Sequence, residues 1–243
     1  VYDEEKEQVV VSGAILSNFS NYYASISVYF DTDKSKTYTD GDTLYYLTTV
    51  DTTQGTESYS FQLVERSDVT KEAPSGYYIV RCTAFGPDTM EETLFYYMSK
   101  EEKKILLRDI NYATASELDM IITFNVDAFD VEGEAYAAAD KEFVLPAVLG
   151  RKPEAGFAAI GDFVDVLKEM MGCDALKKAT TPEQVEAVFD EYGEYFDIDT
   201  AKLYPEFKKM TDEQKTTVYG SLVSVECEDG TGVRAEYDSA VAF

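Results

Sequence analysis

Four aspartates, Asp31, Asp33, Asp40 and Asp42, lie close together in the stretch "DTDKSKTYTDGD". Hard cations such as calcium prefer several oxygen ligands from one compact loop, and carboxylates at this spacing supply them. The stretch departs from an EF-hand loop, because its sixth position is Lys36 instead of glycine and its twelfth is aspartate instead of glutamate. Two interpretations remain: a calcium site, and a solvated hairpin whose turn is shaped by Asp-Gly. No other cofactor is expected.

The sequence contains no histidine, which excludes Ser-His-Asp and Cys-His catalytic sets, histidine metal sites and imidazole general bases. What remains is carboxylate chemistry, above all glycoside hydrolysis, which needs two acidic side chains about 5 to 9.5 Å apart. The absence of tryptophan weakens a sugar-cleft interpretation, since tyrosine or phenylalanine must then provide the aromatic platforms. We therefore expect no catalytic residues and no enzyme, with a glycoside hydrolase as the remaining catalytic alternative.

Three cysteines, Cys82, Cys173 and Cys227, are too few and too scattered for a disulfide scaffold or for paired zinc-binding spacing. We interpret them as buried or incidental thiols. Cys173 and Cys227 lie in the same half of the chain, so one bond between them stays open. The odd number then leaves Cys82 free.

The charge balance limits the partners. The 243 residues include 47 acidic and 21 basic ones, a net charge of -26, which repels nucleic acid and anionic lipid. No stretch approaches the roughly 18 to 20 apolar residues that span a bilayer, so we expect no membrane insertion. The acidic start "VYDEEKEQ" is not a signal peptide, which predicts a mature chain or an excised segment.

Up to about residue 97 the chain consists of short runs rich in β-branched and aromatic residues. Apolar residues alternate within these runs, as Ala24, Ile26 and Val28 do, which predicts strands with one buried and one wet face. Such short strands in just under 100 residues predict an immunoglobulin-like β-sandwich over residues 1–98. The predicted strands are 9–16, 22–30, 43–50, 58–64, 76–84 and 93–97.

From Ser99 onward the apolar residues recur at helical spacing, and several helix starts follow a Thr or Asp that favours an N-cap. The sequence therefore predicts an all-α domain over residues 99–243 and an α+β fold of two domains. The predicted helices include 134–149, 157–171, 182–194, 201–209, 211–223 and 232–242.

The helical half repeats itself, since "ATASELDMIITFNVDAFDV" and "ATTPEQVEAVFDEYGEYFDID" align at an offset of 67 residues. A slightly larger offset aligns "AGFAAIGDFVDVL" with "TGVRAEYDSAVAF". We expect two related units, at about 104–171 and 175–243, that bury their faces against each other. The paired positions are Leu118 with Val185, Ile121 with Val188, Ile122 with Phe189, Phe129 with Phe196, Asp130 with Asp197 and Val131 with Ile198.

The second unit stops as its last helix begins, at "DSAVAF". This predicts that the helix leaves an apolar face that a following module or a further copy of the chain covers. Val233, Tyr237, Ala240 and Val241 form this predicted assembly interface.

Four stretches, "SGYYIVRCTAFG", "DINYATASELDMI", "LKKATTPEQVEAVF" and "VRAEYDSAVAF", carry a family resemblance. The chain resembles the modular surface-exposed proteins of Gram-positive anaerobic bacteria, in which immunoglobulin-like modules alternate with acidic helical regions. The resemblance implies an extracellular or cell-surface location, at the cell envelope, and carries over no catalytic residue.

These observations favour a structural or adhesive segment that spaces or joins modules, with protein partners or further copies of the chain. The alternative is a module that binds a glycan or a host protein through the loops of the sandwich.

Overall fold

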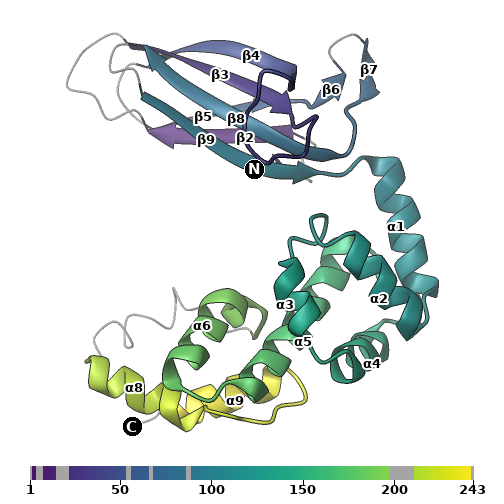
Figure 1. Cartoon of the computed structure of the whole chain (residues 1–243), viewed down its shortest axis with the longest axis vertical. Helices are drawn as coiled ribbons and strands as arrows, with labels where there is room; N and C mark the ends of the chain where they lie inside the picture. Colours follow the sequence, from purple (N-terminus) through teal and green to yellow (C-terminus); the bar gives the residue numbers. More distant parts are fainter. Residues whose placement is uncertain are drawn as a thin grey trace. The chain divides into compact units, whose positions relative to one another are not determined.

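The computed structural model describes residues 2–3, 8–14, 22–52, 56–65, 68–85, 89–196 and 211–241. The fold is mixed α and β and divides into two compact units, Val1–Lys104 and Ile105–Phe243. Strands form the first unit and helices the second (Figure 1). The predicted boundary at residues 98 and 99 lies between the last strand and the first helix, and the independent folding of each part stays a prediction.

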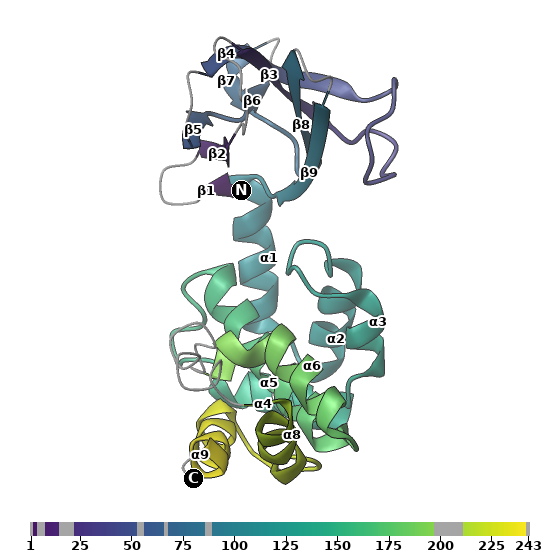
Figure 2. The same ribbon diagram turned by 90° about the vertical axis from the view of Figure 1, so that its left-hand side faces the viewer.

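The first unit contains antiparallel sheets with the strand orders β1-β2-β5, β4-β3-β8-β9 and β6-β7. Figure 2 shows the first two as separate layers. The strands are β1 (Tyr2–Asp3), β2 (Gln8–Ala14), β3 (Tyr22–Phe30), β4 (Thr43–Thr52), β5 (Thr56–Phe61), β6 (Val64–Glu65), β7 (Asp68–Glu72), β8 (Gly76–Phe85) and β9 (Thr89–Tyr97).

The two larger sheets share one hydrophobic core. Val9 of β2 and Phe61 of β5 belong to the same buried cluster as Val28 of β3 and Val80 of β8. The ring of Tyr46 on β4 stacks on Phe61 with 3.9 Å between centroids, so aromatic contacts also join the two layers. The inward residues follow the alternation that the sequence predicts, because successive side chains of a strand point to opposite faces.

Tyr78 lies at the centre of this core and is fully buried. Its hydroxyl donates a hydrogen bond to the backbone oxygen of Pro74 at 2.8 Å. Burial raises the pKa of the phenol well above its usual value. The hydrogen bond lets the polar end of a large aromatic residue enter the core without leaving an unsatisfied donor.

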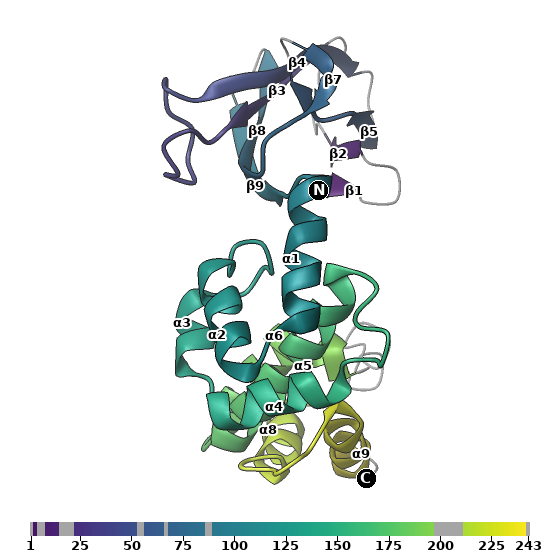
Figure 3. The same ribbon diagram turned by 90° about the vertical axis from the view of Figure 1, so that its right-hand side faces the viewer.

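The second unit is built around α5, which contacts α4, α6, η1 and α9 (Figure 3). Four apolar residues of α5 are almost completely buried: Phe163, Leu167, Met170 and Leu176. The elements are α1 (Lys100–Tyr112), within which the boundary between the units falls, α2 (Ala115–Phe124), α3 (Gly133–Ala138), α4 (Lys141–Arg151), α5 (Ile160–Lys178), α6 (Pro182–Tyr192), η1 (Gly193–Phe196), α8 (Asp212–Ser221) and α9 (Gly230–Val241).

One predicted helix, 134–149, is two helices in the structure. α3 ends at Ala138, and Asp140 caps α4 because its side chain accepts a hydrogen bond from the Glu142 amide at 3.0 Å. The alanine-rich run before Asp140 favours a continuous helix, but the cap starts a new one. The predicted helix 201–209 lies outside the described residues.

The inward faces of α2 and α6 correspond as the repeat predicts. Leu118 and Val185 are buried, as are Ile122 and Phe189, and the turns that follow bury Phe129 and Phe196. In the fourth apolar pair, Val188 is buried and Ile121 is partly exposed. The partners of Asp130 and Val131, Asp197 and Ile198, lie outside the described residues.

The register predicted for α5 and α9 is wrong. Buried positions correspond at an offset of 70 residues, not at the offset of 76 that aligns "AGFAAIGDFVDVL" with "TGVRAEYDSAVAF". Both sequences carry small residues and acids at similar spacing, and only packing distinguishes the two registers. The matched buried pairs are Phe163 with Val233, Leu167 with Tyr237 and Met170 with Ala240.

The predicted exposed face of the last helix is also wrong. Val233, Tyr237 and Ala240 are buried within the single chain, and Val241 is partly buried. The Tyr237 ring lies 5.3 Å from the ring of Phe189, so α9 packs back onto α6. This intramolecular contact supplies the cover that a further module or copy was expected to provide.

Candidate functional site

The loop that joins β3 to β4 gathers three of the four aspartates predicted to bind calcium. Carboxylate oxygens of Asp31, Asp33 and Asp42 lie within 4.8 Å of one another, whereas Asp40 is outside this group. Asp31 is buried, Asp33 is exposed and Asp42 is intermediate. The sequence therefore predicted the cluster, apart from Asp40, and cation binding there stays a prediction.

Each of the six carboxylate oxygens in this cluster accepts a hydrogen bond from the same loop. Such bonds favour the charged form, and those from Ser35 are the main reason that the pKa of the Asp33 carboxyl lies below its usual value. The carboxylates thereby hold the loop in shape. The bonds are Ser35 N to Asp31 at 3.1 Å, Lys36 N to Asp31 at 2.8 Å, Ser35 N to Asp33 at 3.0 Å, Thr39 Oγ1 to Asp33 at 3.1 Å, Thr32 N to Asp42 at 3.0 Å and Thr39 N to Asp42 at 2.7 Å.

The shape of this loop has a conformational cost. Lys34 and Lys36 adopt positive φ angles of 59° and 60°, a region that residues with side chains rarely occupy. The Asp31 carboxylate offsets part of this cost by accepting the Lys36 amide. Tyr38 then folds back toward the strands, where its ring meets that of Tyr29 at 4.7 Å and the Arg81 guanidinium at 3.8 Å.

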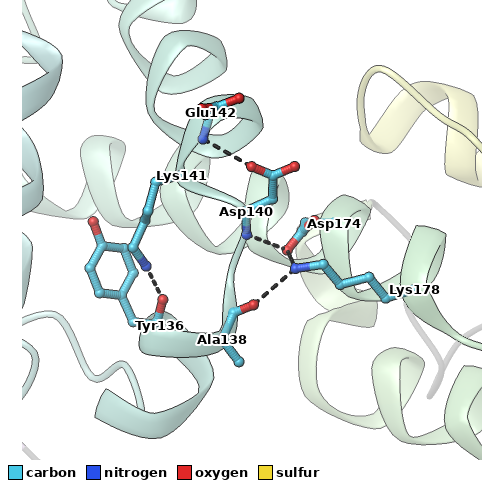
Figure 4. Close-up of polar contacts among 7 residues, drawn as sticks. All are labelled: Tyr136, Ala138, Asp140, Lys141, Glu142, Asp174 and Lys178. Atoms are coloured by element: carbon cyan, nitrogen blue, oxygen red, sulfur yellow. Dashed lines mark hydrogen bonds and ion pairs between the residues drawn. The ribbon is translucent and has the colours of Figure 1, made fainter.

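A second polar centre lies in the helical unit, where α5 meets the junction between α3 and α4. Asp174 of α5 is almost fully buried, and its Oδ2 accepts hydrogen bonds from the Asp140 amide at 2.9 Å and from Lys178 Nζ at 2.6 Å. Lys178 Nζ also donates to the Ala138 oxygen at 2.9 Å. Figure 4 shows these side chains converging on the junction, so one carboxylate and one ammonium tie α5 to the end of α3 and the start of α4.

Lys141 completes the cover of the α3 C-terminus. Its ammonium donates a hydrogen bond to the backbone carbonyl oxygen of Tyr136 and lies 3.3 Å from the centre of the Tyr136 ring. Burial lowers the pKa of this ammonium, against the opposing charge of Asp119. The Tyr136 hydroxyl donates to Asp119 at 2.8 Å. Lys141 and Lys178 therefore donate to carbonyl oxygens at the C-terminal end of α3. The Tyr136 oxygen also accepts the Ala139 amide at 3.2 Å.

Another buried cation, Lys168, lies further along α5. Its Nζ is 3.0 Å from the Asp130 carboxylate, and the backbone of Asp130 is in the left-handed region with φ of 49°. The hydrogen bond and charge of Asp130, together with Tyr195, outweigh the desolvation that opposes them and raise the pKa of Lys168. The pair ties α5 to the turn after α2.

Beside the Asp174 centre, α3, α5 and α6 enclose an open groove of about 320 Å³. Its walls are mostly small and apolar, and Met171 and Val188 contribute larger apolar side chains. Glu132 and Glu191 are exposed at the groove and form no ion pair with any described residue. The five alanines of the lining are Ala135, Ala138, Ala139, Ala175 and Ala187.

Sequence reasoning missed this groove and the Asp174 centre. The available signal was the run "AYAAAD", which supplies three of the five alanines and the Asp140 cap. It does not indicate which distant residues face it.

The three cysteines Cys82, Cys173 and Cys227 are free thiols in this structure. Burial raises the pKa of Cys173 to about 12, which keeps its thiol protonated and unreactive.

The chain matches no protein-family model, no curated protein and no solved structure. No helix in the described ranges has the length and apolar character needed to cross a bilayer.

Proposed function

We propose that the chain is a non-catalytic structural or adhesive segment of an exported bacterial surface protein, in which an immunoglobulin-like sandwich and a helical repeat domain space or join modules. The strand order of the first unit is the observation that carries this proposal. In the nomenclature of immunoglobulin-like folds, β1-β2-β5 corresponds to A-B-E and β4-β3-β8-β9 corresponds to C′-C-F-G.

The hydrogen bond of Tyr78 supports the same assignment. A tyrosine near the start of strand F, bonded to the backbone a few residues upstream, is a hallmark of immunoglobulin-like sandwiches. Tyr78 occupies this place at the start of β8 and bonds to Pro74, four residues upstream. Because many cell-surface proteins are built from such sandwiches, the strand order and the tyrosine favour a surface module.

The polar centres of the two units support a structural role. The carboxylates of Asp31, Asp33 and Asp42 accept hydrogen bonds that order their own loop, and Asp174 and Lys178 join helices. These groups are engaged in holding backbone segments. Spacing and presentation need stable modules of this kind.

Labelling of intact cells tests the proposed location and role. An antibody raised against the purified chain is applied to cells of the organism that encodes it, before and after permeabilisation, with a cytoplasmic protein as the control. We expect labelling of intact cells at the level seen after permeabilisation. Labelling that requires permeabilisation, like that of the control, contradicts the proposal.

A second candidate, a module that binds a host protein, is favoured by exposed apolar side chains in the four-stranded sheet. Leu47 on β4 is 61% exposed and Met90 on β9 is 48% exposed. The strand order places β4 and β9 at opposite edges of this sheet, so Leu47 and Met90 offer two separate apolar contact points to a partner. Binding of host extracellular proteins to the chain, lost in Leu47→Ser with Met90→Ser, supports this candidate, and equal binding by both forms contradicts it.

A further inference from the structure

The groove between α3, α5 and α6 combines apolar walls with two carboxylates, those of Glu132 and Glu191, that form no ion pair with any described residue. Its volume of about 320 Å³ lies at the lower end of the roughly 300 to 1,000 Å³ typical of small-molecule pockets. One or two large side chains fill a space of this size. An occupant that matches it carries such side chains next to positive charge, because Glu132 and Glu191 lie at the groove without an ion-pair partner among the described residues.

The outward stripe of α1 has this chemistry. This stripe consists of Lys104, Ile105, Arg108 and Tyr112. Their intervals of one, three and four residues place them on one side of the helix. The opposite side buries Leu106 and Ile110. The stripe is exposed, with 43% of Ile105 and 85% of Tyr112 accessible to solvent.

The two basic side chains of the stripe remain exposed to a partner, although one of them is already paired. Lys104 is exposed and forms no ion pair with any described residue. Arg108 pairs with its own neighbour Asp109 at 2.8 Å, but its side chain stays 64% exposed. In a chain with a net charge of -26, two copies repel each other except where a basic surface meets an acidic one.

We propose that the groove of one copy receives the α1 stripe of a second copy. Ile105 and Tyr112 lie against the alanine walls, and Lys104 and Arg108 face Glu132 and Glu191. The contact joins two different surfaces, so copies add head to tail, into a ring where the rotation between copies closes and into a filament where it does not. This contact supplies the proposed structural protein with a partner, a second copy of the same chain. Only the biological purpose of the contact rests on the proposed function.

The second exposed apolar patch of the helical unit fits the groove less well. Met120 and Phe124 of α2 are 53% and 82% exposed, but α2 contains no basic residue and carries Glu117 and Asp119. Those carboxylates and the carboxylates of the groove repel each other. α1 also carries carboxylates, at Glu101, Glu102 and Asp109, but its four basic residues outnumber them. Charge complementarity therefore selects α1 as the occupant.

Sedimentation of the full chain, with exchanged charges, tests the contact. The groove variant carries Glu132→Lys with Glu191→Lys, and the stripe variant carries Lys104→Glu with Arg108→Glu. The matched control carries Glu183→Lys with Glu186→Lys, which makes the same charge change at exposed positions of α6 outside the groove lining. Circular dichroism verifies that each variant is folded.

One helix in a groove buries less than the roughly 1,600 Å² of a standard interface, so we expect a dissociation constant on the order of 100 µM. The wild type and the control associate as concentration rises through this range. In each variant alone the dissociation constant rises by about tenfold or more, because like charges then face each other. An equimolar mixture of the two variants regains it, since each then offers the charge that the other lacks.

Three results overturn the proposal: a wild type that stays monomeric throughout, a control that loses association as the groove variant does, or a mixture that stays monomeric. A monomeric wild type whose groove binds a different protein overturns the choice of occupant. None of these results affects labelling of intact cells, so failure of the contact and failure of the proposed function are distinguishable.

Discussion

The two polar centres of this protein differ in how far along the chain their partners lie. In the loop between β3 and β4, Asp31 accepts hydrogen bonds from residues four and five positions away. In the helical unit, Asp174 accepts one from the amide of Asp140, 34 positions away. The first centre shapes one loop, and the second fastens separate helices. We therefore expect a buried carboxylate that joins distant backbone segments to contribute more to the free energy of unfolding than one that shapes a single loop.

Replacement of Asp174 is expected to have the largest effect. Asp174→Ala leaves the Asp140 amide without its acceptor and Lys178 without its counter-ion. We expect a loss of about 2 to 4 kcal/mol in the free energy of unfolding, below the top of the range for a broken buried pair because Lys178 is half-exposed. Urea unfolding followed by helical circular dichroism measures it.

The control for this prediction is Asp190→Ala, which removes an exposed carboxylate from α6. It is expected to stay within about 0.5 kcal/mol of the wild type. If Asp174→Ala is as mild as this control, Asp174 does not fasten the helices.

Replacement of Asp31 is expected to cost less. Asp31 is 3% exposed, and Asp31→Ala removes the two oxygens that accept the Ser35 and Lys36 backbone amides. We expect the free energy of unfolding to fall by about 1 to 3 kcal/mol. Asp40→Ala, in the same loop but outside the cluster, is the matched control and is expected to be neutral. Tyrosine fluorescence during urea unfolding reports on this unit, and equal losses in the two variants contradict the assignment.

The local centre was predictable from the sequence because its residues are close along the chain. The strands at 22–30 and 76–84 were predictable for a similar reason, since alternation is a local pattern. The β6-β7 hairpin was missed because "VERSDVTKE" is too charged to indicate strands. The groove and the Asp174 centre depend on which faces of three helices meet, and tertiary packing decides that. The same holds for Tyr237, which Phe189 contacts.

The stability that Asp33 contributes to the β3–β4 loop, and that acid removes, is expected to be smaller than the contribution of Asp31. Hydrogen bonds from Ser35 lower the pKa of Asp33 from its ordinary value of 3.8, so Asp33 stabilises the folded state above that pH. This contribution is lost as pH falls through the lowered pKa. The wild type should therefore melt at a higher temperature than Asp33→Asn at about pH 6, and the two should converge in strong acid. A constant difference across the range contradicts this reasoning.

Calcium is expected to have the smallest effect. The six oxygens of Asp31, Asp33 and Asp42 already accept hydrogen bonds within the loop, so the loop is shaped without a cation. We expect the same melting temperature in millimolar calcium and in EDTA. A higher melting temperature in calcium than in EDTA, lost in the Asp33→Ala variant, would identify the cluster as a cation site. An ion that binds the folded state stabilises it.

If each polar centre stabilises its own compact unit, differential scanning calorimetry of the full chain should resolve two unfolding transitions. We expect Asp174→Ala to lower the melting temperature of only one and Asp31→Ala to lower that of only the other. A single transition that both variants lower, or two transitions that each variant lowers equally, would contradict it.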